Sequence, residues 1–393
     1  MQQFPPSRLL TLTGLPRQRG QIHGESLRRE IHELIRRWQE TLARSSAISP
    51  AKYIREMVKQ TNFTAASEKW TPRLLEEVRG IAEGSGENFN DIFAFQLQDE
   101  EWWFGQEKGL NQPNASRQDS AGRHSSAGRH CSALGWRGDG KQPNLIAQNM
   151  DMPDYMQDYQ VVMRIRDERS ESEILVFSVA GLIALNGMNN SPLGIVCNNL
   201  GQLNHSRDGL PVAYVLRGVL EQKTIGQAQS FLTSIPHASG QNYILGSPMQ
   251  IIDLECSANQ VMEYSPDGRS RSVCHTNHPL VNRDYPNQRL DLGVPSEETQ
   301  AQKDEKTINS RTRYQLLSIH LGAVEWLNID PETARRLLSS HGSQEHPICR
   351  HPDTNEKWST LGTSIMQFGH PAYLFVCPGS PCSAKFSEFP LHS

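Results

Sequence analysis

One cysteine, Cys131, stands where a long polar segment meets the start of an apolar stretch. Residues 105–130 contain almost no apolar side chain and hold the pentapeptide SAGRH twice, at 120–124 and 126–130. This composition is typical of a flexible, exposed loop. The loop can be a plain linker and the thiol a buried, inert one. The alternative is that the chain is cut inside this region, at the bond between His130 and Cys131.

Cleavage at that bond would give Cys131 two reactive groups. Its new α-amine would have a reference pKa of about 7.7–8.0, so it could act as a general base near neutral pH. The thiol, with a reference pKa of about 8.5, becomes a strong nucleophile once a base takes its proton. One residue would then supply both the nucleophile and the base for attack on an acyl carbonyl.

Two further side chains could assist such a reaction. Asp151 ends the run QNMD at 148–151, and its carboxylate could orient the new α-amine, although it can equally be an ordinary turn aspartate. Asn277 lies in the run HTNH, where its amide could donate a hydrogen bond to a developing oxyanion. His275 and His278 resemble half a metal site, but no third ligand is visible at a supporting spacing.

The cysteines as a set do not indicate a disulfide framework or a metal site. Their number is odd, and the chain is large for a disulfide scaffold. No CxxC occurs, and Cys377 and Cys382 are too far apart for a zinc ribbon. No GxGxxG, Walker, GxSxG or HExxH motif is present either. We therefore expect no metal and no cofactor. The seven cysteines are Cys131, Cys197, Cys256, Cys274, Cys349, Cys377 and Cys382.

Composition excludes several classes of protein. The 393 residues carry a net charge of −4, which argues against an electrostatic nucleic-acid binder. No apolar run approaches the roughly 18 residues of a membrane span. The first twenty residues lack the apolar core of a secretory signal, so we expect a cytoplasmic protein.

Periodicity indicates helices first and strands afterwards. A short strand is predicted at 8–15, followed by helices at 25–44, at 72–85 and from 90 onward. After the loop, strands are predicted at 144–150, 159–166, 172–185, 194–200, 241–246 and 250–256, and a strand pair with a turn at 369–371 is predicted at 364–376. Helices are predicted at 211–222, 226–234 and 311–322. Strands in clusters and helices in pairs favour stacked sheets flanked by helices, an α+β fold.

Several motifs, in their order and spacing, carry a family resemblance over most of residues 10–380. They are GQIHG at 20–24, LEEVRGIAEG at 75–84, Cys131-Ser132, AQNMD at 147–151, GIVCNNL at 194–200, GLPV at 209–212 and HTNH at 275–278. With these motifs the chain resembles the acyl-coenzyme A:isopenicillin-N acyltransferase family, which includes carcinine and β-alanyl-dopamine hydrolases. The resemblance implies the four-layer αββα sandwich of N-terminal-nucleophile hydrolases. It also implies a helical α chain, 1–130, and a catalytic β chain, 131–393, which together form one domain and remain associated.

The resemblance assigns roles to three residues. Cys131 would be the nucleophile, first attacking the carbonyl of His130 and later the substrate, while Asp151 fits the active-site aspartate and Asn277 the oxyanion donor. The implied activity is hydrolysis of a small N-acyl amide through a thioester. The alternative is acyl transfer from a coenzyme A thioester or an amide donor to an amine. No nucleic-acid or membrane partner is implied.

Two positions depart from the family pattern. The residue before the cysteine is usually glycine, whereas here it is His130. The penicillin-pathway enzyme has an arginine near its C-terminal strands, but the corresponding residues 357–364 contain none. His130 also keeps open a non-enzymatic alternative, an uncleaved relative that only binds acyl ligands.

Overall fold

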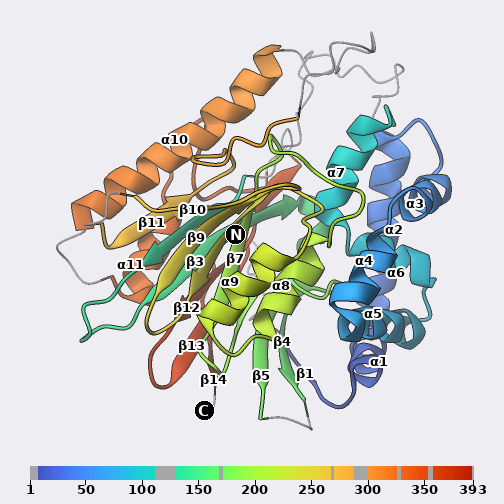
Figure 1. Cartoon of the computed structure of the whole chain (residues 1–393), viewed down its shortest axis with the longest axis horizontal. Helices are drawn as coiled ribbons and strands as arrows, with labels where there is room; N and C mark the ends of the chain where they lie inside the picture. Colours follow the sequence, from blue (N-terminus) through green and yellow to red (C-terminus); the bar gives the residue numbers. More distant parts are fainter. Residues whose placement is uncertain are drawn as a thin grey trace.

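The computed structural model describes residues 8–110, 130–167, 171–266, 270–286, 300–324, 329–352 and 357–391. Within these ranges the strands form two sheets (Figure 1). The larger sheet has the order β1 (Leu9–Leu12), β4 (Gln160–Arg166), β5 (Glu173–Val179), β6 (Asn186–Asn189), β7 (Gly194–Asn199), β8 (Gln241–Gly246), β9 (Ile251–Cys256), β10 (Val261–Tyr264). The smaller has the order β11 (Ser272–His275), β2 (Ser132–Trp136), β3 (Leu145–Pro153), β12 (Trp358–Gln367), β13 (Ala372–Pro378), β14 (Ser387–Leu391).

The two sheets are stacked face to face. Strands β2, β5, β8 and β9 are buried along their whole length, as expected of strands covered on both faces. A Cβ on Gly362 of β12 would lie 2.5 Å from the Phe177 ring of β5. The ring from one sheet therefore fills the space that a glycine leaves in the other.

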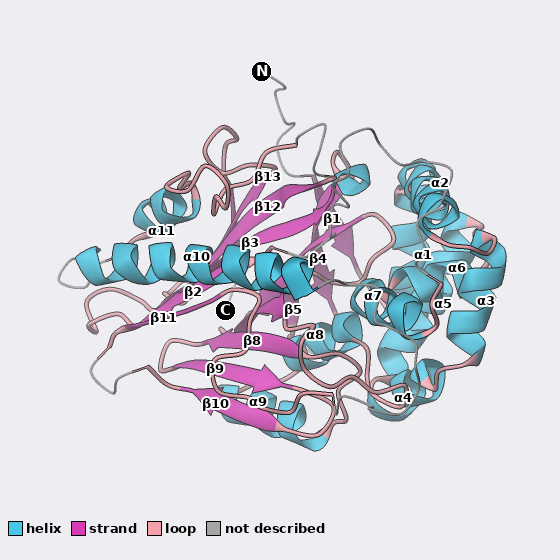
Figure 2. Ribbon diagram, turned by 90° about the horizontal axis from the view of Figure 1, so that it is seen from above, coloured by secondary structure: helices cyan, strands magenta, loops and turns pink. Residues whose placement is uncertain are grey.

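Helices cover the outer faces of the sandwich (Figure 2). Helix α8 (Val212–Leu220) packs on β6 and β7 of the larger sheet, with α9 (Ile225–Ser234) beside it. Helices α10 (Gln300–Val324) and α11 (Pro331–Leu338) pack on the smaller sheet. The layer order is helix, sheet, sheet, helix, which confirms the expected αββα sandwich.

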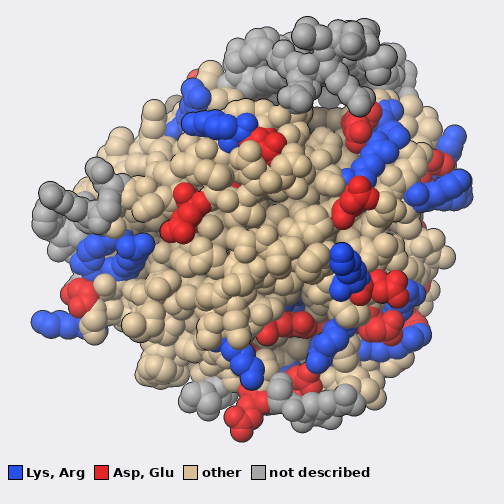
Figure 3. Space-filling view, in the orientation of Figure 1, with Lys and Arg blue, Asp and Glu red and all other residues tan. Residues whose placement is uncertain are grey.

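The N-terminal part is helical, as predicted, and lies alongside the sandwich (Figure 1). Its helices are α1 (Pro16–Ser26), α2 (Arg28–Ser45), α3 (Pro50–Lys59), α4 (Phe63–Trp70), α5 (Pro72–Ser85), α6 (Phe89–Phe95) and α7 (Gln98–Glu107). On the face shown in Figure 3, basic and acidic side chains are mixed, most densely over this helical part. Among the described residues, no helix combines the length and apolar character needed to cross a membrane.

Several boundaries differ from the sequence expectation, and α10 and β12 begin earlier than the predicted 311 and 364. Helix α7 continues to Glu107, so the polar segment begins after it rather than at 105, and its residues 111–129 lie outside the described ranges. The apolar run 172–185 is not one strand. Strand β5 ends at Val179, and Gly181 turns the chain with a φ of +85°.

Helices α1 and α5 touch backbone to backbone. Gly20 and Gly24 lie one turn apart on α1, as do Gly80 and Gly84 on α5, so each pair shares one helix face. A Cβ on Gly20 would lie 1.9 Å from a carbonyl oxygen of α5, and one on Gly80 would lie 2.1 Å from a carbonyl oxygen of α1. The glycine spacing in both sequence motifs thus serves helix packing.

We expect Gly80→Ala to lower the free energy of unfolding by about 3 kcal/mol, because the added methyl must push the two helices apart. Gly226→Ala in α9 is the matched control, since nothing lies within 4 Å of its Cβ position. Urea unfolding of both variants measures the difference. A Gly80→Ala midpoint equal to that of the control would show that α1 and α5 can separate at little cost.

A buried ion cluster joins the N-terminal helices to the sandwich. Glu77 of α5 accepts hydrogen bonds from Arg217 of α8 at 2.8 Å and from Arg19 of α1 at 3.1 Å. Burial alone would raise the pKa of Glu77, but Arg217 and Arg19 lower it to about 2. His23 of α1 is also buried, and its Nε2 accepts from the Gly181 amide at 3.0 Å. Burial lowers its pKa to about 4, so it is neutral at pH 7.

Candidate active site

Cys131 lies directly before β2, in the wall of a cavity. Its side chain is 3% exposed. The thiol sulfur lies 3.6 Å from the sulfur of Met150 and 3.8 Å from the backbone carbonyl oxygen of Asp151, both on the neighbouring strand β3. Strand β3 therefore holds the thiol at the end of the smaller sheet, facing the space between the two sheets.

The cavity beside the thiol encloses about 410 Å³ of empty space, part of it open to solvent. Apolar lining comes mainly from β3, α8 and the turn after β5, and includes Met150, Met152, Leu182, Leu185 and Leu216. A polar side includes Gln96, Gln98, Asp99, Asn199 and Gln241. Its walls come from both sides of the His130–Cys131 bond in the sequence, because Gln98 and Asp99 precede the bond and Met150 and Leu216 follow it.

One carboxylate lines this cavity and is held by two side-chain amides. Asp99 accepts hydrogen bonds from Asn199 at 3.2 Å and from Gln241 at 2.7 Å. The amides belong to β7 and β8, whereas Asp99 belongs to α7. The contacts therefore fix the polar side of the cavity across the junction between the helical part and the larger sheet.

Arg313 of α10 reaches the backbone around the candidate cleavage bond. Its Nη1 donates to the carbonyl oxygens of His130 at 2.6 Å and Cys131 at 2.7 Å, and to the hydroxyl of Ser132 at 2.9 Å. Burial lowers the pKa of Arg313 to about 10, so the guanidinium still carries its charge at pH 7. A charged donor in a dry site is well suited to stabilise negative charge on a carbonyl oxygen.

Sequence reasoning did not single out Arg313 and noted only that residues 357–364 contain no arginine. Arg313 lies on the predicted helix 311–322, within α10. Arg313 lies one and two turns before Leu317 and Leu321, which are both buried. Arg313 thus lies on the same helix face as these two buried leucines, and an arginine on an apolar face is a sequence signal that could have identified it as buried.

Asn277 contacts Arg313 rather than standing alone. Its Oδ1 accepts from the guanidinium at 2.9 Å, and its Nδ2 donates to the carbonyl of Asn199 at 3.1 Å. Its backbone amide donates to the hydroxyl of Ser310 at 2.7 Å. With the Asn309 side chain, which accepts from Arg313 Nε at 2.9 Å, Asn277 holds the guanidinium against the chain at 130–132.

The two histidines beside Asn277 have separate partners. His275 is buried and lies 2.8 Å from the carboxylate of Glu255. Burial alone lowers the pKa of His275, but that carboxylate raises it above its usual value. His278 contacts the hydroxyl of Ser310 at 2.8 Å. Neither belongs to a group of three or more metal-ligating side chains among the described residues.

The run 148–151 alternates between the two faces of β3. Gln148 faces the larger sheet, where it contacts Asn186 at 2.9 Å. Asn149 faces outward and donates to the carbonyls of Leu338 at 2.8 Å and Ile348 at 3.0 Å. Because strand side chains alternate, Met150 shares the inner face and Asp151 the outer one.

Asp151 thus approaches Cys131 through its backbone, while its carboxylate faces β12. Oδ1 accepts from the hydroxyl of Thr360 at 2.8 Å, and Oδ2 lies 3.9 Å from Nε of Arg350. Burial raises the pKa of Asp151 to about 6, although Arg350 and Thr360 act in the opposite direction. The carboxylate is therefore mostly charged at pH 7, and it becomes protonated when the pH falls below about 6.

This shift predicts a pH-dependent stability. A carboxyl with a higher pKa in the folded state costs stability as it ionises, so its contribution falls as pH rises from about 4 to about 6 and then stays constant. At 1.36 kcal/mol per pKa unit, the rise from its usual 3.8 to about 6 corresponds to roughly 3 kcal/mol. Between pH 4 and pH 7, the free energy of unfolding of Asp151→Asn should rise by about that amount relative to the protein with Asp151.

Urea unfolding at several pH values, in a Cys131→Ala background so that the backbone bonds are identical, measures this difference. Asn keeps an oxygen that can accept from Thr360. The attraction between Arg350 and the ionised Asp151 is already included in the net pKa of about 6, so its loss adds no separate pH dependence. Parallel stability curves for the Asp and Asn proteins between pH 4 and pH 7 would contradict the raised pKa.

Comparison with known proteins gives the family. Residues 136–377 match the acyl-coenzyme A:6-aminopenicillanic acid acyl-transferase family, starting in the strand that follows Cys131. A search of curated proteins finds no match. Among solved structures, a conjugated bile acid hydrolase from Clostridium perfringens is similar, with 13% identity and a TM-score of 0.41, over 67% of this chain and 97% of that one. A penicillin V acylase from Agrobacterium tumefaciens is similar with 14% identity and a TM-score of 0.38, over 66% and 86%. Because the family match spans more than half of its residues, the chain belongs to the acyl-coenzyme A:6-aminopenicillanic acid acyl-transferase family.

Proposed function

We propose that the chain is a cysteine amide hydrolase that activates itself by cutting the bond between His130 and Cys131. The observation that supports this most is the hydrogen bond of 2.6 Å from Arg313 to the carbonyl oxygen of His130. That oxygen is the one that would gain negative charge if the neighbouring thiol attacked. A charged donor is therefore present at the point where the charge would develop.

The self-cleavage proceeds in two steps. The Cys131 sulfur bonds to the carbonyl carbon of His130, the carbon–nitrogen bond breaks, and the nitrogen takes up a proton to become a free amine. Water then attacks the thioester, which releases the carboxylate of His130 and regenerates the thiol. The product chain begins at Cys131, with nucleophile and α-amine on the same residue.

In turnover the same sulfur attacks the acyl carbonyl of an N-acyl compound. The acyl group lies in the cavity beside Met150, and the α-amine takes the thiol proton and passes a proton to the leaving amine. Water hydrolyses the thioester. The helical and catalytic fragments stay associated, because Gln98 and Asp99 from one and Leu216 from the other line the same cavity.

Acyl transfer is the second candidate, because the matching family takes its name from an acyltransferase. It shares the thioester with hydrolysis and differs only in the group that attacks it. A bound amine in place of water would give a new amide. The acyl donor would then be an amide or a coenzyme A thioester.

Product analysis tests the proposal and separates the two candidates. The cleaved protein is incubated with N-acyl amides carrying a labelled acyl group, with and without an added amine. Hydrolysis gives the labelled acid in both cases, whereas transfer gives a labelled amide when the amine is present. A labelled thioester on the fragment that starts at Cys131 is expected by mass spectrometry. Label release that persists unchanged in Cys131→Ala would refute the proposal.

A further inference from the structure

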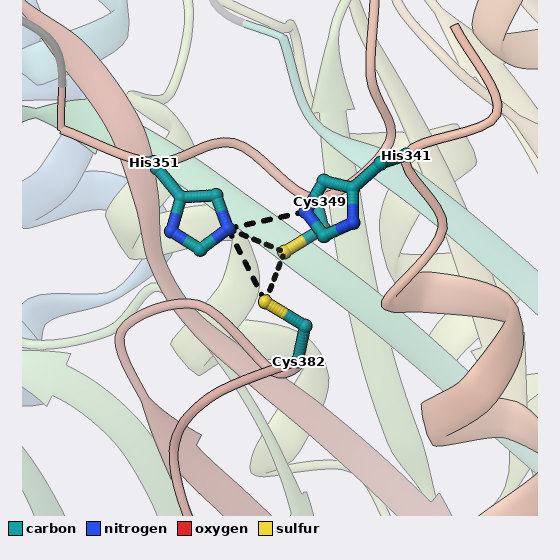
Figure 4. Close-up of side chains that lie close together, drawn as sticks. All are labelled: His341, Cys349, His351 and Cys382. Carbon is teal, nitrogen blue, oxygen red and sulfur yellow. Dashed lines mark hydrogen bonds between the residues drawn. The ribbon is translucent and has the colours of Figure 1, made fainter. Parts of the chain in front are cut away.

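Four metal-ligating side chains converge outside the candidate active site (Figure 4). They are His341, Cys349, His351 and Cys382, and their four ligand atoms all lie within 4.8 Å of one another. The two sulfurs are 3.6 Å apart, and the Nε2 atoms of the two histidines are 3.1 Å apart. Nε2 of His351 lies 3.2 Å from the Cys382 sulfur and 4.0 Å from that of Cys349.

These distances resemble the edges of a zinc-centred tetrahedron. Zinc binds sulfur at about 2.3 Å and imidazole nitrogen at about 2.0–2.1 Å, which gives edges of roughly 3.8 Å between sulfurs, 3.3 Å between nitrogens and 3.5 Å between sulfur and nitrogen. The four separations given above differ from these by about half an ångström or less, and the remaining two, from His341 to the two sulfurs, are within 4.8 Å. An ion could therefore enter if the His341 ring moved toward the two sulfurs.

We propose that His341, Cys349, His351 and Cys382 bind one structural zinc ion. Two thiolates and two neutral imidazoles form a closed tetrahedral set, typical of structural zinc sites, with no position left for a catalytic water. Sulfur and imidazole ligands do not suit magnesium or calcium. Two thiolates also balance the charge of the ion. This differs from the sequence expectation of no metal.

The site would hold together an irregular part of the chain. Residues 340–352 form neither helix nor strand, and such a segment gains order from a cross-link. Cys382 lies in the turn after β13, so an ion would tie that turn to the segment. A direct contact already joins them, since the Ser380 hydroxyl donates to the carbonyl of Arg350 at 2.8 Å.

The cross-link also concerns the candidate active site. Arg350 lies between the ligands Cys349 and His351, and its guanidinium faces the carboxylate of Asp151. Its backbone amide donates to the hydroxyl of Thr360 at 3.0 Å, the same hydroxyl that donates to Asp151. A zinc ion would thus fix the backbone on both sides of Arg350. We infer that it positions this arginine against β3.

Metal analysis of the full-length chain tests the site. Protein purified from zinc-supplemented medium and passed over a desalting column should hold about one zinc per chain. Cys382→Ser and His351→Gln should each weaken zinc binding roughly 100-fold or more, because even groups that only support a ligand are worth 10–100-fold. Both side chains are exposed, so these variants should fold, which circular dichroism can check.

Two controls separate this site from other thiols and histidines. Cys131→Ala removes the candidate nucleophile, and His370→Gln removes an exposed histidine in the turn before β13. Both should keep the metal. Cobalt substitution adds an independent readout, since tetrahedral thiolate ligation gives strong visible bands and a thiolate-to-cobalt charge-transfer band. These bands should be present in Cys131→Ala and absent in Cys382→Ser.

Three results would overturn the proposal. They are a wild-type chain that takes up neither zinc nor cobalt, variants that bind metal as the wild type does, and a disulfide between Cys349 and Cys382 in the native protein. The disulfide would appear as a non-reduced mass two hydrogens lower. None of these readouts depends on self-cleavage or on amide hydrolysis, so they test the zinc site independently of the proposed function.

Discussion

Cys131→Ala should remain a single chain of 44.3 kDa, whereas the wild-type protein should yield two fragments, the larger beginning at Cys131. The methyl group of alanine cannot attack the carbonyl of His130, so the acyl shift that starts cleavage cannot occur. Amide hydrolysis should be lost in the same variant. The expected effect is complete on both readouts, because one sulfur atom serves both reactions.

Intact mass under denaturing conditions and the N-terminal sequence of the larger fragment measure the cleavage. Cys274→Ala is a suitable control, since its thiol is also buried and lies on β11, the strand next to β2, where it contacts Ser318. That variant should be cut like the wild type. An intact wild-type chain after long incubation would refute self-activation under those conditions. It would favour a protein that needs a trigger or one that only binds acyl ligands.

The elements that surround Cys131 were predictable because local composition sets them. The change from polar loop to apolar strand is visible at 130–132, and helix α5 carries its own proline start and apolar spacing. Helix α1 was not predicted, because it has few apolar residues and the role of its glycines is visible only from their packing against α5. Its packing depends on a partner sixty residues away, which no local pattern reports.

The site was predictable only in part, for the same reason. Asp151 and Asn277 were singled out from motifs, but their orientation depends on strand alternation and on α10. The zinc ligands were missed because they come from two separated segments, and Cys382 meets Cys349 rather than its sequence neighbour Cys377. Spacing rules detect sites that one compact segment builds, whereas here the turn after β13 supplies the fourth ligand.

Arg313→Met is expected to slow self-cleavage by about 10²–10³-fold. The guanidinium donates to the carbonyl oxygen of His130, and loss of one oxyanion donor costs about that much in comparable reactions. Methionine has a similar length and no charge, so it still fills the space that the Arg313 side chain occupies. The self-cleavage rate of Arg313→Lys should fall between those of the wild type and Arg313→Met. Lysine keeps the charge but cannot bind His130, Cys131 and Asn277 at once.

Two readouts distinguish an oxyanion role for Arg313 from other roles. The cleavage rate of the folded protein tests a merely structural role, and the response to hydroxylamine tests a role only in the later hydrolysis. The rate is measured on folded, freshly purified protein, with the folded fraction taken from circular dichroism, so that lost stability does not count as lost chemistry. Hydroxylamine, which cleaves thioesters, is then added. If Arg313 stabilises the attack on His130, little thioester forms in Arg313→Met and hydroxylamine cannot restore cleavage. If the arginine acts only in the later hydrolysis, the thioester accumulates and hydroxylamine restores cleavage at the wild-type rate. Cleavage of the folded Arg313→Met protein within about ten-fold of the wild type would remove the oxyanion role altogether, since that is below the smallest effect expected of such a donor.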